Sequence, residues 1–592
     1  MASKARTKAR TPIHPDRHQP ALARERFIVN EPPDDEAVPL DVVFVGGGPA
    51  GLAGAIELAR LVREGNEAGN GPGDLEIGVL EKAEGLGDHN LSGAVINPRS
   101  FRELFPGMSD ADFPFRRPVS REAVYFLTGK SHLRIPAPPT MRNHGNHIAS
   151  ICEVVRWLGE RAEEAGVMIL PGFPADALLA DGDDVIGVRT AARGLDRDGQ
   201  PGGGGYMPPV DVTARVTVLS EGTRGTLTQA YLDWQEVGSA NPQIYSLGVK
   251  ELWEVARPLD RIIHTMGWPL VGGGQLAGGG AAGAGADGAG FGGTFAYPLA
   301  DDLVALGLVV SLDYGNARLD VHGLLQRLKH HPLFRGILEG GEMVEWGAKT
   351  IPEGGYHSLP ERRHGSGICI VGDAAGYVDV ASLKGIHYAI QSGILAARTI
   401  YQALKADDTS EAGLASYTAA VDGSFIARDL RRNRNMRLAF KSGFVLGGAK
   451  ASLATVTGGR VPGGRIATET DAAEPKWLTG AGGASGGAAS TGAAAGALGP
   501  LPGPLAVSKV DAVFKSGNQT RDDIPSHLTV GEDVSAEVAE MYVHLCPAGV
   551  YERDGDQLRV NAPNCVDCKA TDVLGPRWAP REGGSGPRYR RM

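Results

Sequence analysis

The sequence is poor in the residues that mark several protein classes. It has only 5 cysteines in 592 residues, too few for a disulfide-rich secreted scaffold. Aromatic residues make up 6% of the chain. The 59 basic residues are outnumbered by 69 acidic ones, so the basic excess typical of nucleic-acid-binding proteins is missing. No uninterrupted apolar run reaches the roughly 18 residues of a spanning helix, and no apolar stretch follows Met1. We therefore expect a soluble or peripheral protein without a secretory signal peptide, in a reducing compartment.

Glycine is what the sequence has in excess. The chain contains 85 glycines and 38 prolines. Together they make up about a fifth of the residues, which is below the roughly 25–30% of glycine plus proline that marks a wholly disordered chain. Many of them gather in two Gly/Ala-rich tracts, at 271–290 and 479–504, which predicts discrete linkers or inserts. At roughly 150 residues per domain, the length predicts about four folded units.

A dinucleotide-binding pattern begins at residue 41. A short apolar run, 41–45, predicts a buried parallel strand, and Gly46, Gly48 and Gly51 follow before a helical segment. In such a motif the glycines permit a tight turn, a close approach to a pyrophosphate and close packing of helix on strand. A second predicted strand ends in Glu81, whose carboxylate suits the ribose hydroxyls. The alternative is a glycine-rich turn without a ligand.

A second motif chooses between NAD and FAD. The strand 368–371 is followed by Gly372 and Asp373, which resembles the second FAD fingerprint of glutathione-reductase-like flavoproteins, where the aspartate binds the ribityl chain and a helix begins directly afterwards. The segment 216–222 resembles their middle strand motif. Three motifs in this order predict FAD, and no second Rossmann unit for a nicotinamide is present.

Three cysteines form a separate cluster near the end of the chain. Cys546 is followed by Cys565 and Cys568, a ferredoxin-like spacing. Thiolates are the usual ligands of iron–sulfur clusters, but zinc also accepts three cysteines with one further ligand. The spacing alone leaves iron–sulfur and zinc equally open.

Several stretches together resemble the electron transfer flavoprotein–ubiquinone oxidoreductase family, from about residue 41 to the C-terminus. They are Leu91–Ala94, Asn143–Asn146, Val249–Trp253, His264–Leu270, Ala305–Val310, Lys329–Pro332 and Cys546–Tyr551. The resemblance implies an oxidoreductase with one FAD, one [4Fe–4S] cluster and a quinone pocket, which takes electrons from reduced electron transfer flavoprotein and reduces membrane ubiquinone. It implies that FAD is held by Gly46, Gly48, Gly51, Glu81, Gly372 and Asp373, and the cluster by Cys546, Cys565 and Cys568.

The resemblance also places the quinone site at Gly292 and Gly293. Glycines let a flat ring approach the backbone, where an N–H can bond its carbonyl oxygen. The alternative is a tight turn after the Gly/Ala-rich insert.

The cluster motif departs from the family at one position. The family has a fourth cysteine three residues after Cys568, where this chain has Thr571. Three outcomes are open: an oxygen ligand (Asp567, Thr571, Asp572 or water) completes a [4Fe–4S] cluster, the site holds a three-iron cluster, or the cluster is absent. A changed ligand set is expected to change the reduction potential.

A basic segment precedes a moderately apolar one. Five arginines are followed by the mostly small and apolar stretch 438–457. The arginines are Arg428, Arg431, Arg432, Arg434 and Arg437. This suits an interfacial segment on anionic lipid, and a quinone reductase must reach the bilayer. We expect a peripheral protein on an energy-transducing membrane, the bacterial cytoplasmic or the mitochondrial inner membrane. The alternative is a buried helix with a solvated basic face.

The resulting prediction combines α/β and α+β folds. It comprises a glutathione-reductase-like FAD-binding Rossmann domain, an interleaved quinone-binding domain and a C-terminal ferredoxin-like module. Expected boundaries are 1–39 (disordered arm), 40–240 (FAD, with an insert near 120–205), 241–358 (quinone), 359–410 (FAD), 411–470 (membrane-contacting helices), 471–505 (linker) and 506–592 (iron–sulfur).

Two alternative functions remain open. One is a related FAD-dependent polyprenyl reductase of geranylgeranyl type, and the other is a degenerate FAD-binding protein without a working cluster.

Overall fold

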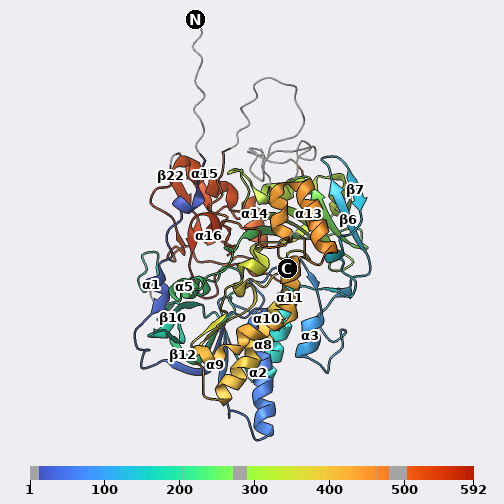
Figure 1. Cartoon of the computed structure of the whole chain (residues 1–592). Helices are drawn as coiled ribbons and strands as arrows, with labels where there is room; N and C mark the ends of the chain where they lie inside the picture. Colours follow the sequence, from blue (N-terminus) through green and yellow to red (C-terminus); the bar gives the residue numbers. More distant parts are fainter. Residues whose placement is uncertain (1–11, 203–204, 271–289, 462, 479–502, 556) are drawn as a thin grey trace.

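The computed structural model describes residues 12–202, 205–270, 290–461, 463–478, 503–555 and 557–592. Two large sheets, a group of helices and a C-terminal module make up this part of the chain (Figure 1). The predicted Gly/Ala-rich insert and most of the predicted linker lie outside the described residues.

The first sheet carries the predicted nucleotide site. Its central strands are parallel, because β2 pairs with β3 and β12, β3 pairs with β9, and β12 pairs with β19. On one side of them, β11 pairs antiparallel with β12, and β10 pairs antiparallel with β11. Strand β1 pairs with β10 and β18 pairs with β19, which brings the sheet to nine strands. The bounds are β1 (Ile28–Val29), β2 (Val38–Val45), β3 (Ile77–Glu81), β9 (Met168–Pro171), β10 (Ala175–Asp181), β11 (Asp184–Thr190), β12 (Asp211–Leu219), β18 (His364–Gly365) and β19 (Ile368–Ile370). The second half of β2, residues 42–45, is apolar and buried throughout, as a parallel strand covered on both faces requires.

Long helices pack against this sheet. Helices α2 (Pro49–Glu67) and α8 (Ile386–Lys405) lie side by side in the lower part of Figure 1, and α4 (Ile151–Glu164) packs on α2. The chain returns to this sheet through β19 and α8, so two separated segments of the sequence build it.

The second sheet has seven strands, in the order β17-β13-β16-β15-β14-β6-β7. All neighbours are antiparallel except β14 and β6. The bounds are β6 (Glu122–Leu127), β7 (His132–Ile135), β13 (Tyr245–Glu254), β14 (Ile262–Gly267), β15 (Gly292–Pro298), β16 (Leu303–Ser311) and β17 (Glu342–Pro352), with α6 (Val321–Lys329) and α7 (Pro332–Leu338) nearby. The predicted insert near 120–205 is therefore divided, since its first strands join this sheet and its last strands join the first one.

The prediction of a disordered arm over 1–39 is wrong for the described residues 12–39. Ile13 is buried, and its main chain exchanges hydrogen bonds with Lys476 at 2.8 and 2.7 Å. Phe27 is buried at the end of α1 (Arg24–Phe27), and β1 pairs with β10. The arm is polar overall, but two apolar side chains and a strand edge are enough to fix it.

The predicted membrane-contacting segment consists of short helices. They are α9 (Glu411–Leu414), α10 (Ser416–Gly423), α11 (Phe425–Asn433), α12 (Met436–Ala439) and α13 (Phe444–Val456). A 3₁₀ turn and Gly443 at φ 91° separate α12 from α13, so the stretch 438–457 is not one continuous helix. No helix among the described residues is both long enough and apolar enough to cross a bilayer.

The C-terminal module shares its core with the second sheet. Buried side chains of β13, β16 and β17 form one cluster with Tyr542, Leu574 and the three C-terminal cysteines. Its elements are α14 (Lys509–Lys515), β20 (Leu528–Thr529), α15 (Ala536–Leu545), β21 (Tyr551–Asp554), β22 (Gln557–Val560), α16 (Ala570–Leu574) and β23 (Arg577–Trp578). The remaining elements are α3 (Arg99–Leu104), α5 (Thr226–Trp234), β4 (Val95–Ile96), β5 (Arg117–Pro118) and β8 (His147–Ile148).

Candidate cofactor and quinone sites

The glycine-rich turn has the geometry that the sequence predicted. Gly46 follows β2 directly at φ 113°, and a Cβ there would lie 2.5 Å from the main-chain oxygen of Ser220. A Cβ on Gly51 would lie 2.3 Å from the oxygen of Gly46. In contrast, a Cβ on Gly48 would meet only the Nδ2 of Asn90 within 4 Å, at an ordinary contact distance of 3.8 Å. Helix α2 begins at the next residue, so its free N–H groups face the space in which a pyrophosphate would lie.

Glu81 ends β3 beside this turn. Its carboxylate accepts hydrogen bonds from the N–H groups of Gly47 at 2.9 Å and Ala83 at 2.8 Å. The side chain therefore also orders the turn, in addition to its predicted contact with the ribose hydroxyls. Each carboxylate oxygen keeps acceptor capacity for such a contact.

The two FAD motifs and the middle strand meet at one place. A Cβ on Gly372 would lie 3.0 Å from the Cβ of Ala50, so the second motif touches the start of α2. Ser220, from the middle motif, donates from its hydroxyl to the main-chain oxygens of Val45 and Gly46. Segments more than 300 residues apart thus surround one cradle, which fits a dinucleotide and not a bare turn.

Asp373 lies next to this cradle, but its local structure differs from the prediction. A short 3₁₀ turn, Gly372–Ala375, follows β19, and α8 begins only at Ile386. The expected helix directly after Asp373 is therefore wrong, and left-handed Gly376 (φ 83°) redirects the chain instead. Burial raises the pKa of the Asp373 carboxyl to about 6, and a ligand hydroxyl that donates to it would offset that cost.

Cys546, Cys565 and Cys568 come together as predicted. All three are buried and line one common space. Burial raises the pKa of the Cys565 thiol to about 12 and raises those of the other two thiols as well. The thiols therefore stay protonated until a metal centre displaces their protons. Three sulfur donors around one mostly apolar space fit an iron–sulfur cluster.

Thr571 lines the same space as the three thiols, together with Tyr551, Lys569 and Trp578. The residue at the position of the family's fourth cysteine therefore borders the cluster site, although it has a hydroxyl in place of a thiol.

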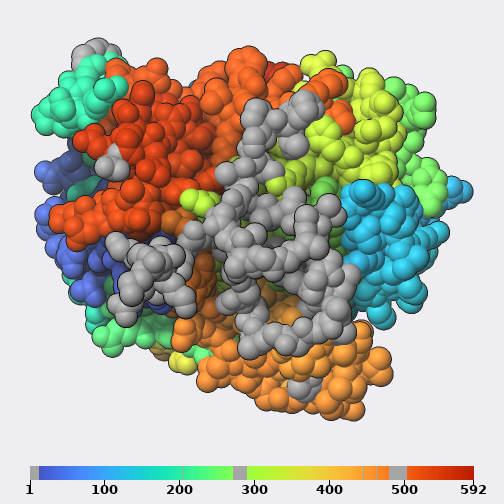
Figure 2. Space-filling view, turned by 90° about the horizontal axis from the view of Figure 1, so that it is seen from above, coloured from blue at the N-terminus to red at the C-terminus, as the bar shows by residue number. Residues whose placement is uncertain are grey.

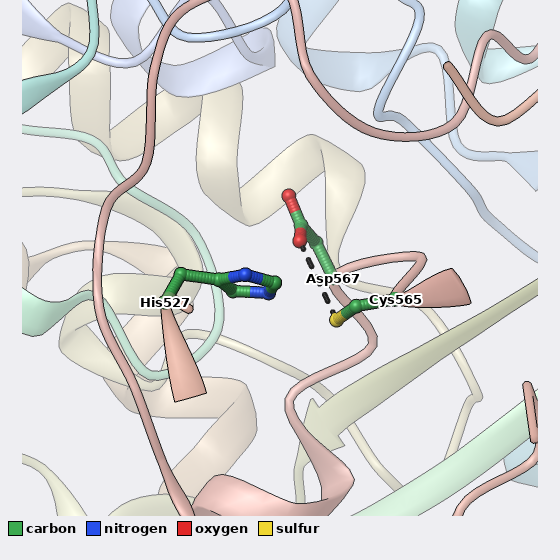
Figure 3. Close-up of side chains that lie close together, drawn as sticks. All are labelled: His527, Cys565 and Asp567. Atoms are coloured by element: carbon green, nitrogen blue, oxygen red, sulfur yellow. Dashed lines mark hydrogen bonds between the residues drawn. The ribbon is translucent and has the colours of Figure 1, made fainter. Parts of the chain in front are cut away.

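The structure adds His527, which the sequence analysis missed. One ring nitrogen of His527, the Cys565 sulfur and a carboxylate oxygen of Asp567 all lie within 4.8 Å of one another (Figure 3). Only the fold joins His527 to these residues, since it lies 38 positions before Cys565.

Gly292 and Gly293 lie in strand β15 and not in a turn. A Cβ on Gly292 would lie 2.1 Å from the oxygen of Val309, and one on Gly293 would lie 2.8 Å from the oxygen of Thr265. Close strand packing thus already requires glycine at Gly292. The preceding ring, Phe291, lies 4.9 Å from the ring of Phe440, beside α12. The glycine pair is therefore adjacent to the helices predicted to contact the membrane.

Arg437 does not belong to an exposed basic face. It is buried, donates to Glu353 at 2.9 Å and Asp313 at 3.0 Å, and lies 4.6 Å from the centre of the Phe291 ring. Arg428, Arg431 and Arg432 are exposed. The predicted run of five interfacial arginines is wrong at this position.

Lys349, in β17, links the flavin and cluster sites. Its Nζ donates to the main-chain oxygen of Asp567 at 3.3 Å. Burial lowers the pKa of Lys349 to about 8, partly offset by Asp567, Cys568 and Glu81. The same ammonium group partly offsets the rise that burial causes in the pKa of Asp373. A buried lysine in a strand gives no sequence signal, because its neighbours come from other domains.

A dinucleotide cradle assembled from two chain segments, joined to a cysteine-lined cluster site, defines an FAD-dependent oxidoreductase with an iron–sulfur centre. The chain matches the family profile "ETF-QO, ubiquinone-binding" over residues 245–351. It matches "Electron transfer flavoprotein-ubiquinone oxidoreductase, 4Fe-4S" over residues 503–590.

Comparison with known proteins then gives the family. The chain is 35% identical over 587 residues to the electron transfer flavoprotein-ubiquinone oxidoreductase of Pseudomonas aeruginosa, covering 94% of this chain and 100% of the relative. It is 34% identical over 583 residues to the human mitochondrial protein of that name, covering 93% and 89%. The chain belongs to the electron transfer flavoprotein–ubiquinone oxidoreductase family. Membership confirms the predicted fold class and the cofactors FAD and an iron–sulfur cluster.

A solved structure supports the fold alone. The geranylgeranyl bacteriochlorophyll reductase-like protein of Thermoplasma acidophilum has a TM-score of 0.52 and 19% identity, with 72% of this chain and 92% of that chain covered. At this identity it supports the flavoprotein fold and does not favour the polyprenyl reductase as a function.

Proposed function

We propose that this chain passes electrons from reduced electron transfer flavoprotein, through FAD and its iron–sulfur cluster, to ubiquinone in a membrane. The observation that carries the proposal is the position of Lys349, whose charge acts on both the flavin cradle and the cluster loop. The two cofactor sites are therefore close together, and electron transfer between two cofactors requires such a short distance.

The residues of the cradle hold and orient FAD. The N–H groups at Gly48 and the start of α2 bind the pyrophosphate, and Glu81 binds the ribose. Asp373 accepts a hydrogen bond from the ribityl chain. When bound, FAD would supply the chemistry of accepting electrons singly and collecting two for the quinone, which the protein's own side chains do not perform.

Gly292 and Gly293 bind the quinone ring. The backbone of Gly293 is the more open of the two, because a Cβ there would meet a single atom within 4 Å, the main-chain oxygen of Thr265. Phe291 and Phe440 lie beside it and provide an apolar wall. The buried Arg437 group fixes this wall, since its guanidinium joins Phe291 to two carboxylates.

Helix α13 contacts the membrane surface. Leu446 is 56% and Val456 is 86% exposed, and Leu453 is exposed too. The orange segment that includes α13 bulges from the lower edge of the molecule in Figure 2. Exposed apolar side chains next to exposed arginines of α11 match an interfacial segment on anionic lipid. We infer from this that the chain works at the periphery of a quinone-containing, energy-transducing membrane, bacterial or mitochondrial.

Anaerobic mixing separates this proposal from its rivals. The holoprotein is mixed with reduced electron transfer flavoprotein, or with NADPH and an unsaturated isoprenoid, while flavin absorbance is followed. We expect bleaching by the flavoprotein and none by NADPH. Reduction by NADPH with saturation of the isoprenoid would instead establish the polyprenyl reductase. A flavin that neither donor reduces would establish a degenerate FAD-binding protein.

A further inference from the structure

The cluster site presents an oxygen where the family has a fourth sulfur. Thr571 is buried, lies on the first turn of α16 and lines the space shared by the three thiols. Asp567 and Lys569 adopt left-handed conformations, at φ 54° and 62°, and these two turns wrap the backbone around that space. The hydroxyl of Thr571 lies 3.5 Å from that of Tyr551, which lines the same space.

The carboxylate of Asp567 is already fully engaged. Its Oδ1 accepts from Trp578 Nε1 at 3.1 Å and from Arg581 at 3.0 Å, and its Oδ2 accepts from Lys82 at 2.6 Å. Asp567 is also missing from the residues that line the cysteine-bounded space. Ligation of iron by Asp567 would break a buried ion pair, so the structure argues against it.

The carboxylate of Asp572 is engaged in the same way. Its Oδ2 accepts from Arg224 at 2.5 Å, and its Oδ1 accepts from the N–H of Trp578 at 3.0 Å. It too does not line the space. Of the three side-chain oxygens that the sequence left open, only that of Thr571 remains.

The Thr571 hydroxyl has acceptor capacity to spare. In the described part of the chain its side-chain contact is the hydroxyl of Tyr551 at 3.5 Å, the upper limit for a hydrogen bond. His527 is the rival, because neither of its ring nitrogens has a hydrogen-bond partner among the described residues. However, His527 approaches Cys565 and Asp567 and is not among the residues that line the space shared by all three thiols.

We propose that the cluster of this chain is bound by Cys546, Cys565, Cys568 and the hydroxyl oxygen of Thr571. One iron thus differs from the other three in having a neutral oxygen ligand. An oxygen donor binds this iron more weakly than a thiolate, so this iron is the labile one. The inference requires the cluster of the proposed function but not its electron donor or acceptor.

The lability gives a defined reaction with a one-electron oxidant such as ferricyanide. The [4Fe–4S]²⁺ cluster loses one electron to ferricyanide, which becomes ferrocyanide. The resulting [4Fe–4S]³⁺ core releases Fe²⁺ and leaves [3Fe–4S]⁺, so charge and iron balance. No bond to the three thiolates breaks.

The experiment compares four anaerobically purified holoproteins: wild type, Thr571→Cys, Thr571→Ser and Thr571→Val. Iron and sulfide content and low-temperature EPR are recorded before and during titration with ferricyanide. We expect wild type and Thr571→Ser to form the [3Fe–4S]⁺ signal readily. Thr571→Cys should form it about tenfold or more slowly, and Thr571→Val should already lack the fourth iron as purified.

A His527→Gln variant tests the rival ligand. We expect it to keep the iron content of wild type. Loss of the fourth iron in His527→Gln, with Thr571→Val unchanged, would overturn the proposal in favour of histidine. Equal ferricyanide sensitivity of Thr571→Cys and wild type would overturn it as well. Because the readout is iron and EPR, failure here is distinct from a failure to react with electron transfer flavoprotein.

Discussion

Lys82 Nζ donates to Asp567 Oδ2 at 2.6 Å, across 485 positions of sequence. Lys82 follows Glu81, which orders the glycine-rich turn, and Asp567 lies between two cluster cysteines. Adjacent residues at the end of one strand therefore serve two sites. Burial raises the pKa of the Asp567 carboxyl, but the cations of Arg581 and Lys82 outweigh this effect and hold the pKa well below its usual value.

The cation of Lys82 should raise the reduction potential of the cluster. A positive charge favours the state with the additional electron, so Lys82→Met should lower the potential by on the order of tens of millivolts. A redox titration followed by EPR measures this change. The exposed Lys130→Met variant is the control and should leave the potential unchanged. Equal potentials in wild type and Lys82→Met would mean that this charge does not act on the cluster.

Gly51→Val should lose most of its FAD. The valine Cβ would lie 2.3 Å from the oxygen of Gly46 and 2.6 Å from the hydroxyl of Ser220, so the turn must move. Overpacking of this kind costs about 1–3 kcal/mol. Flavin absorbance per protein measures the loss. The control is Gly107→Ala, where a Cβ meets nothing within 4 Å. Full FAD content in Gly51→Val would contradict the assignment of the cradle.

These two cases show what the sequence could predict. The glycine turn and the cysteine spacing are local patterns, so their geometry follows from a few consecutive residues. The partners of Lys82 and Lys349 depend on how distant segments fold together, which periodicity does not encode. The prediction of Arg437 as an interfacial arginine is wrong for the same reason. It lies in a run of arginines, but its partners Asp313 and Glu353 are 124 and 84 positions away. His527 needed the fold to bring it to Cys565.

Asp373 should make the flavin-free protein sensitive to pH. Its folded pKa is raised from 3.8 to about 6 by burial, so its protonated form is favoured in the fold. The stability that this proton provides is complete below about pH 4 and is lost as pH rises through 6. Asp373→Asn cannot ionise and should not lose it.

Thermal unfolding of flavin-free protein at pH 5 and pH 7.5 measures this effect. The advantage of Asp373→Asn over wild type should grow by about 1.4 kcal/mol between these two pH values. The exposed Asp183→Asn variant is the control and should show no such growth. An advantage that is the same at both pH values would mean that Asp373 ionises freely in the fold.

Arg437→Met should damage the quinone wall. It leaves the carboxylates of Asp313 and Glu353 buried without their shared cation, which costs about 3–5 kcal/mol. We expect a lower Tm and slower ubiquinone reduction, with flavin reduction by electron transfer flavoprotein less affected. Arg142→Met, at an exposed position outside the proposed membrane-contacting segment, is the control. Unchanged ubiquinone reduction would separate Arg437 from the quinone site.

Helix α13 should decide membrane binding. Leu446→Asp and Val456→Asp each replace an exposed apolar side chain by a charge, so each should weaken binding to anionic vesicles by about tenfold. Vesicle sedimentation measures it. Met168→Ser, an exposed position on the edge strand β9, is the control. Unchanged binding of both aspartate variants would move the membrane contact elsewhere.

The most direct test of electron transfer through this chain is ubiquinol formation. The holoprotein is bound to vesicles that contain ubiquinone and is given reduced electron transfer flavoprotein under anaerobic conditions. We predict that ubiquinol forms in step with oxidation of the flavoprotein, one ubiquinol for every two electrons delivered, and that none forms when the holoprotein is left out. Oxidation of the flavoprotein that bleaches the bound flavin but leaves ubiquinone oxidised would contradict the account.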